Sequence, residues 1–177
     1  MREVTVPLSR PRDAQRARVY RAEDAWAARL DVARRGAPLA TVGGSALLLP
    51  AERRFGSLAA ASSYAEKVLD LPAVVRLGGR LAAPALRPRR GQRAAHWESP
   101  GVIALPVPRH GEPWGLRESV LLHELAHHVG ESAGLTSGHR APYPALMLVL
   151  VEAVLGAEAA FALRVAYGEE NVEVGVL

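Results

Sequence analysis

Hydrophobic side chains recur at three- and four-residue intervals through residues 11–35, the spacing that places them on one face of an α-helix. The residues on this face are Val19, Ala22, Trp26, Leu30 and Ala33. Pro11 suits a first helical turn, Asp13 suits the positive end of a helix dipole, and Gly36 can end the helix. The pattern therefore predicts a first helix with a buried apolar face and an arginine-rich outer face.

Shorter apolar runs follow, separated by glycine and proline. Residues 39–42 and 46–49 flank the pair Gly43-Gly44, which predicts a β-hairpin. Residues 57–71 predict a second helix that begins with a capping serine, and Pro72 either ends this helix or begins a further short turn.

Strand patterns and one long helical pattern occupy the rest of the chain. Residues 85–89, 94–97 and 101–105 predict three short strands separated by turn residues. Residues 143–167 predict a last helix that is apolar nearly all round, so we expect it to be central and buried. The tail, residues 171–177, alternates valine with polar residues and is consistent with a short strand.

The helix predicted over residues 116–129, with Gly130 as its stop, carries an HExxH motif. Residues four apart share one helix face, so His123 and His127 can bind one metal ion. Glu124 lies close enough to act on a water bound to that ion. The opposite side of the helix is apolar and can pack into a core through Leu122, Leu125, Ala126 and Val129.

The composition limits how such a site can be completed. The chain has no cysteine, so neither disulfides nor thiolate ligands are possible. A catalytic zinc usually has three protein ligands and one open position. The metzincin spacing would place the third ligand at Ala133, which excludes that class. His139 at the start of the last helix is the preferred third ligand, and Glu152 or Glu158 within that helix is the alternative.

Other residues are candidates for supporting roles. Tyr143 or Arg140, beside the third histidine, could donate a hydrogen bond to an oxyanion. Glu152 or Glu158, both expected to be buried, could orient a ligand histidine by a hydrogen bond from behind. The strand at residues 101–105 could be the sheet edge along which an extended substrate lies. His128 points about 100° away from its neighbour and is expected to lie outside the site.

The order HELAHH, short loop, then a histidine opening an apolar helix resembles a family of small actinobacterial metallohydrolases. The likeness extends to RDAQRARVYRAEDA, LLLPAERRFGSLAAASSYAEKVL and RRGQRAAHWE. More distantly, the motif order is similar to SprT-like zincin metalloproteases, whose third histidine commonly precedes a glycine where this chain has Arg140. The resemblance implies one α+β, zincin-like domain over residues 1–177, with about four helices packed on a small mixed or antiparallel sheet. It also implies zinc on His123, His127 and His139, with Glu124 as the base.

These features predict a zinc-dependent hydrolase, a metallopeptidase that uses a zinc-bound water with Glu124 as general base on a peptide or protein substrate. Residues 1–10 are expected to be loosely held, and they lack the apolar segment of a secretory signal. No apolar stretch is long enough to span a membrane, so a cytoplasmic location is expected.

The charge of the chain supports an alternative. The net charge is +4 and the pI is about 10.1, and all but one of the 22 basic residues are arginine. The alternative hypothesis is a nucleic-acid-associated protein that binds through its arginine-rich first helix and has an accessory or inactive zinc site.

Overall fold

The computed structural model describes residues 13–89, 94–107, 114–135 and 138–177, so the predictions for residues 1–10 lie outside it. Its α-helices are α1 (Arg16–Arg34), α2 (Leu58–Leu69), α3 (Pro72–Gly78), α4 (Glu118–Ser132), α5 (Pro142–Leu155) and α6 (Ala157–Glu169). Its strands are β1 (Leu39–Val42), β2 (Ser45–Leu48), β3 (Ala85–Arg89), β4 (His96–Glu98) and β5 (Val102–Pro106), and a 3-10 turn, η1 (Trp114–Leu116), precedes α4. The α+β class is confirmed, but the described residues form six α-helices, two more than predicted.

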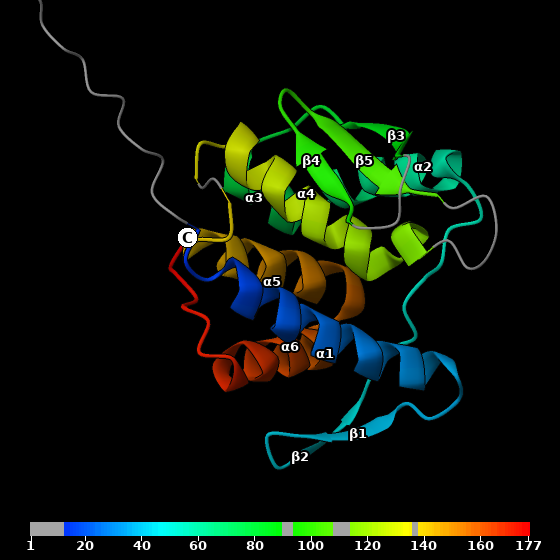
Figure 1. Ribbon diagram of the computed structural model, residues 1–177, viewed down its shortest axis with the longest axis vertical. Helices are drawn as coiled ribbons and strands as arrows, with labels where there is room; N and C mark the ends of the chain where they lie inside the picture. The colour runs from blue at the N-terminus through cyan, green and yellow to red at the C-terminus, as the bar shows by residue number, and fades with distance from the viewer. Residues whose placement is uncertain (1–12, 90–93, 108–113, 136–137) are drawn as a thin grey trace, which may run out of the picture.

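Helix α5 lies between α4 and α6, and α1 packs across α6 (Figure 1). The single last helix predicted over residues 143–167 is wrong, because the chain breaks at Gly156 into α5 and α6. Gly156 has a φ of +90°, a conformation that glycine adopts without the steric cost of a side chain. The other additional helix is α3, which begins at Pro72 after α2 has ended.

The apolar face of α1 is confirmed. Its five predicted inward residues are at most 6% exposed, and Trp26 donates its indole N–H to the carbonyl of Ala159 in α6 at 3.0 Å. Helix α1 begins at Arg16, later than predicted. The polar residues just before it, Asp13 and Gln15, hydrogen-bond to the segment that precedes α5.

The hairpin of β1 and β2 is confirmed, with positive φ at both Gly43 and Gly44. In the three-stranded sheet the order is β3-β5-β4, with β5 parallel to β3 and antiparallel to β4. The prediction that residues 101–105 form the edge is therefore wrong, because β3 and β4 occupy both sides of β5. The outer strand that lies beside α4 is β4 (Figure 1).

Helix α4 continues through Gly130, which is buried inside it, so the predicted stop at that residue is wrong. The helix ends in a Schellman motif centred on Gly134, whose φ is +68°. The N–H of Leu135 donates to Gly130 at 2.8 Å and the N–H of Gly134 donates to Glu131 at 3.1 Å. Gly134, four residues after Gly130, adopts the left-handed conformation and so determines where the helix ends.

The start of α4 is fixed by two buried carboxylates. Glu118, the first residue of α4, accepts hydrogen bonds from the Tyr64 hydroxyl at 2.5 Å and from the guanidinium of Arg53 at 2.7 Å. Glu52 accepts the N–H of Ser119 at 3.4 Å. Glu52 thus satisfies one N–H group that a helix start leaves without a partner, and Glu118 binds the start of α4 to Arg53 and Tyr64. The position of α4 is therefore set by its neighbours.

Residues 171–177 form no strand, contrary to the prediction. The tail instead packs against the start of α5 and α1, where Gly175 donates to the carbonyl of Ala141 at 2.7 Å and Glu173 donates to Gln15 at 3.0 Å. These partners are a helix start and a side chain, so the tail has no strand to pair with there. In the described part of the chain, no helix is both long and apolar enough to cross a membrane.

Candidate metal centre

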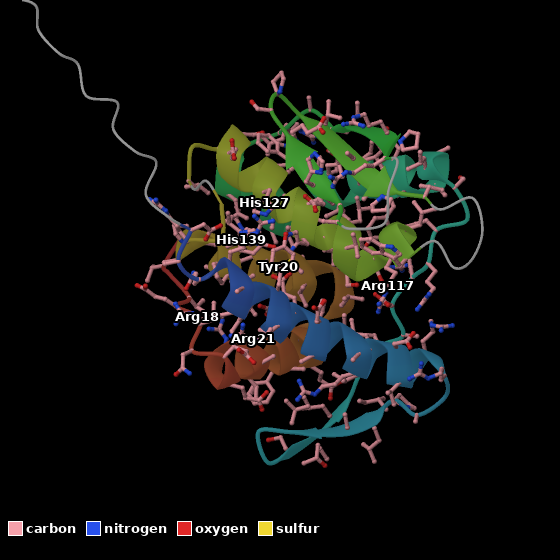
Figure 2. The ribbon with its side chains drawn as sticks, viewed as in Figure 1. Arg18, Tyr20, Arg21, Arg117, His127 and His139 are labelled. Carbon is pink, nitrogen blue, oxygen red and sulfur yellow. The ribbon has the colours of Figure 1, made fainter. Side chains whose placement is uncertain are left out.

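Three histidines, His123, His127 and His139, converge beside α1 and α4. Two of them, His127 and His139, are labelled in Figure 2. Nε2 of His139 lies 3.2 Å from Nε2 of His127 and 3.3 Å from Nε2 of His123. A tetrahedral metal with nitrogen ligands at 2.0–2.1 Å requires ligand nitrogens roughly 3.3–3.4 Å apart. Two of the three separations are therefore close to those that one ion would impose, and the three ligand atoms all lie within 4.8 Å of one another.

The protonation of the rings shows why these separations favour a cation. Nδ1 of His123 donates to Glu23 and Nδ1 of His139 donates to Asp13, so in the neutral rings both Nε2 atoms carry lone pairs. Lone pairs that face one another at such short range repel. One added proton can bridge a single pair of nitrogens, whereas a metal ion satisfies all three.

His123 is held from behind by a buried carboxylate of α1. Glu23 accepts from Nδ1 of His123 at 2.5 Å, from the Tyr167 hydroxyl at 2.7 Å and from the Tyr143 hydroxyl at 3.3 Å. The Tyr143 oxygen also lies 2.6 Å from Nδ1 of His123. This hydrogen-bond network fixes the ring with Nε2 directed at the other histidines, an arrangement typical of metal-bound histidine.

His139 has an equivalent support from the residues before α1. Asp13 Oδ2 accepts from Nδ1 of His139 at 2.8 Å and from the backbone N–H of the same residue at 3.0 Å. Gln15 donates to the carbonyl of His139 at 2.6 Å. Both the ring and the backbone of His139 are thus bound to the chain that leads into α1.

The pKa values follow from burial and from these carboxylates. Burial, together with His123 and His139, lowers the pKa of His127 to about 2, so this ring is neutral and free to ligate. Burial also lowers the pKa of His139. Burial lowers the pKa of His123 too, but the Glu23 carboxylate outweighs it and raises that pKa above the usual value of histidine.

Glu124 is placed beside the histidines without a full set of partners. It is 2% exposed, and its Oε2 atom is buried with no hydrogen bond among the described residues. The backbone N–H of Trp97 in β4 donates to the carboxylate, while burial raises its pKa above the usual range of glutamate. An unsatisfied buried carboxylate oxygen is costly for stability and is typical of a functional group that awaits a ligand.

A cavity of about 190 Å³ opens onto this group, and Glu124, His127 and His139 line it. The ring of Tyr20, from α1, lies 5.1 Å from the ring centres of both His123 and His139 and borders the same cavity. Figure 2 shows Tyr20 beside His127 and His139. The histidine group is therefore reachable from a cleft bounded by α1, α4 and β4.

Of the supporting residues expected from sequence, Tyr143 lies behind a ligand ring and Glu152 is not buried, while the role of Arg140 stays a prediction. The Tyr143 hydroxyl contacts Nδ1 of His123, on the side away from the converging Nε2 atoms, so it orients a ring rather than facing a reacting group. Arg140 is exposed. Glu152 and Glu158 are exposed rather than buried, and neither belongs to the histidine group, because they lie on the outer faces of α5 and α6.

His128 lies outside the group, as expected. Its Nε2 donates to the carbonyl of Ala82 at 2.9 Å, and its Nδ1 accepts the indole N–H of Trp97 at 3.3 Å. The ring therefore links α4 to β4 and to the segment before β3, and it has a structural role.

The arginine-rich face of α1 is partly neutralised. Arg21 pairs with Glu170 at 2.8 Å, and Arg29 pairs with Glu169 at 3.7 Å, both at the end of α6. These pairs reduce the positive charge that this face could offer to a nucleic acid.

Sequence reasoning missed Asp13 as a histidine partner, Glu23 and Tyr20. Glu23 had a readable signal, because it is a carboxylate four residues after Val19 and three before Trp26, on the apolar face of a predicted helix. A charge in such a position needs a buried partner. Asp13 and Tyr20 carried no comparable signal, since their roles depend on how α1 lies against α4.

Comparison with known proteins supplies no family. No protein-family model, no curated protein and no solved structure matches this chain.

Proposed function

We propose that this protein is a zincin-like, zinc-dependent hydrolase, and specifically a metallopeptidase, with His123, His127 and His139 as the metal ligands. The observation that carries the proposal is that Nε2 of His139 lies 3.2 Å from Nε2 of His127 and 3.3 Å from Nε2 of His123, with Glu23 and Asp13 behind two of the rings. The proposal agrees with the family resemblance of the sequence motifs.

The donor set fits zinc in a catalytic role. Three neutral imidazoles leave the fourth position of a tetrahedral site open, which distinguishes catalytic zinc sites from closed structural ones. The unbonded oxygen of buried Glu124 lies next to that group, where a water would complete its hydrogen bonds. A bound zinc ion supplies Lewis acidity, which acidifies a water and polarises a carbonyl group.

Residues of the protein supply proton transfer and the orientation of the ligand rings. Glu124 accepts the proton of the attacking water and later delivers it to the leaving amine. Its raised pKa, caused by burial, brings proton uptake and release nearer to neutral pH. Glu23 and Asp13 hold two rings in the tautomer that directs Nε2 into the site. Tyr20 lines the cleft beside the histidines and adds an aromatic wall to it.

Metal content tests the ligand set. The wild-type protein should bind one zinc per chain, measured by inductively coupled plasma mass spectrometry after dialysis. His139→Ala should lose stoichiometric zinc at neutral pH. His128→Ala is the matched control, because it removes a neighbouring buried histidine that does not face the site, and it should keep the metal. Stoichiometric zinc in the His139 variant would place the third ligand elsewhere.

Hydrolysis tests the base. Glu124→Gln keeps the shape of the side chain and all three histidines, so zinc binding should be retained while metal-dependent cleavage of an unfolded protein such as casein falls by at least about 100-fold. Full activity in a zinc-loaded Glu124 variant would refute the assigned role. Failure of the wild-type protein to cleave casein, together with normal zinc content, would refute the peptidase assignment and leave the metal site standing.

A further inference from the structure

The cleft has a second compartment. A cavity of about 270 Å³ lies between α1, the start of α4 and the residues just before β4. It shares Tyr20, Ala95 and Glu124 with the smaller cavity at His127 and His139, so the two compartments adjoin at the proposed base. A group held in the larger compartment would lie directly beside the reacting centre.

The larger compartment has mainly apolar walls. The rings of Trp26 and Trp114 border it from α1 and η1, and Ala27, Ala95 and Val120 leave the space between them open. An apolar cavity of about 150 Å³ is enough to hold a benzene ring. At about 270 Å³ this compartment has room for one aromatic or branched aliphatic side chain.

The charged groups that border the compartment do not favour a charged occupant. Arg117 is held by an ion pair with buried Glu52 and donates to the carbonyl of Ala27 at 3.3 Å. Asp24, on α1, is exposed, and burial of part of the carboxyl group raises its pKa. Glu23, His123 and the proposed base Glu124 also line the compartment, and Glu23 is paired with His123. Arg117 and Asp24 have opposite signs, so we take apolar contact as the main attraction that the rest of the walls offers.

We infer that the substrate carries a bulky apolar side chain next to the scissile amide, and that this side chain is bound in the compartment between Trp114, Ala27 and Val120. The inference rests on the proposed function, because it takes the histidine group as the reacting centre. It assigns the substrate class as peptides with an aromatic or branched aliphatic residue at the cleaved bond, as distinct from small, acidic or basic ones.

Binding of hydroxamates to the zinc-loaded protein tests this without requiring turnover. Acetohydroxamate reports the metal alone, 3-phenylpropanohydroxamate adds an aromatic ring, and 6-aminohexanohydroxamate adds a cation of similar reach. Isothermal titration calorimetry at fixed pH gives the three dissociation constants. The phenyl compound should bind at least 10-fold more tightly than acetohydroxamate, and the cationic compound should gain less than threefold.

Variants that fill the compartment test whether the tighter binding of the phenyl compound arises there. Ala27→Phe places a ring in the cavity from α1 and should remove the advantage of the phenyl compound, with the acetohydroxamate affinity unchanged within twofold. Val120→Phe fills the same space from α4, in case the first variant does not fold. Ala28→Phe is the matched control, because Ala28 is exposed on the same helix, and it should behave as the wild type.

The outcomes separate this inference from the proposed function. Equal affinities of the small and phenyl compounds, a cationic compound that binds most tightly, or a phenyl advantage that survives both filled variants would each overturn the inference. In those cases zinc loading and acetohydroxamate binding would still support the metal site. A protein that neither loads zinc nor binds acetohydroxamate would overturn both.

Discussion

The buried carboxylate of Glu23 provides the sharpest test of the site, because it contacts His123 at Nδ1, away from the converging Nε2 atoms, and yet should control metal binding. It also borders the larger compartment, so metal affinity rather than substrate binding is the quantity to measure. Glu23→Gln preserves the size of the side chain and removes its charge. The carboxylate accepts one hydrogen bond from His123 at 2.5 Å and two from the hydroxyls of Tyr143 and Tyr167. A glutamine has one carbonyl oxygen for these three donors, and its NH₂ group must face a donor.

The magnitude follows from two losses. The hydrogen bond to His123 changes from charge-assisted to neutral, which roughly halves its strength. Loss of a carboxylate behind a ligand histidine typically costs 10–100-fold in metal affinity. With about 1.4 kcal/mol for each factor of ten, we expect zinc binding to weaken by about 1.4–2.8 kcal/mol. Glu23 is only 8% exposed, so the lost charge is poorly compensated by solvent and the upper half of this range is expected.

The assay is competition for zinc between the protein and a chromophoric chelator at pH 7. Asp24→Asn is the control, because it removes a neighbouring charge on the same helix that is exposed and makes no hydrogen bond to the histidines among the described residues. It should change the zinc dissociation constant by less than threefold. A folded Glu23→Gln protein that binds zinc as tightly as the wild type would refute the reasoning, since it would show that ring orientation does not depend on this carboxylate.

Three further predictions concern stability. His128→Ala should keep zinc but lower the free energy of unfolding by about 1–3 kcal/mol in urea titrations, because Trp97 loses its hydrogen-bond acceptor; an unchanged midpoint would contradict the linking role of the ring. Glu118→Ala leaves Tyr64 and the backbone N–H of Arg53 without an acceptor, so we expect a loss of about 2–4 kcal/mol, and an effect below about 1 kcal/mol would show that water replaces it. Free zinc at about 100 times its dissociation constant should stabilise the protein by about 2.7 kcal/mol, so its Tm should lie about 5–11 °C above that of the chelator-treated protein. Calorimetry that shows no difference between the two samples would contradict the metal site.

Much of the local structure could be predicted because short-range rules decide it. The inward face of α1, the Gly43-Gly44 hairpin and the Ser57 cap of α2, whose hydroxyl accepts the N–H of Ala60 at 3.1 Å, all follow from residue spacing and turn chemistry. Errors arose where two signals competed. Gly130 resembles a helix stop, yet it remains helical because Gly134 forms the Schellman turn instead.

Sheet order and the supports of the site could not be predicted, because both depend on contacts between distant segments. Strand β5 is central because β3 pairs with it in parallel, across a connection that contains β4, and no local pattern specifies that pairing. The HExxH spacing placed His123, Glu124 and His127 on one helix, and motif order suggested His139. The carboxylates behind the histidines come from 100 and 126 residues away in the chain.

The pairing of Glu23 with His123 is itself an argument for a bound cation. Two buried ionisable groups cost several kcal/mol in lost hydration, and apolar residues of similar size are often equally stable or more stable in such positions. Val19, Ala22 and Trp26 already form the buried apolar face of α1. Packing of the helix therefore does not explain a carboxylate at Glu23. The carboxylate becomes favourable when His123 carries positive charge, from a proton or from a metal ion on Nε2. A single proton would account for the carboxylate behind one ring only. Asp13 places a second carboxylate behind His139 in the same way, and both rings direct Nε2 at the same point. Two carboxylates behind two converging imidazoles are therefore better explained by one shared divalent ion than by protonation of either ring alone.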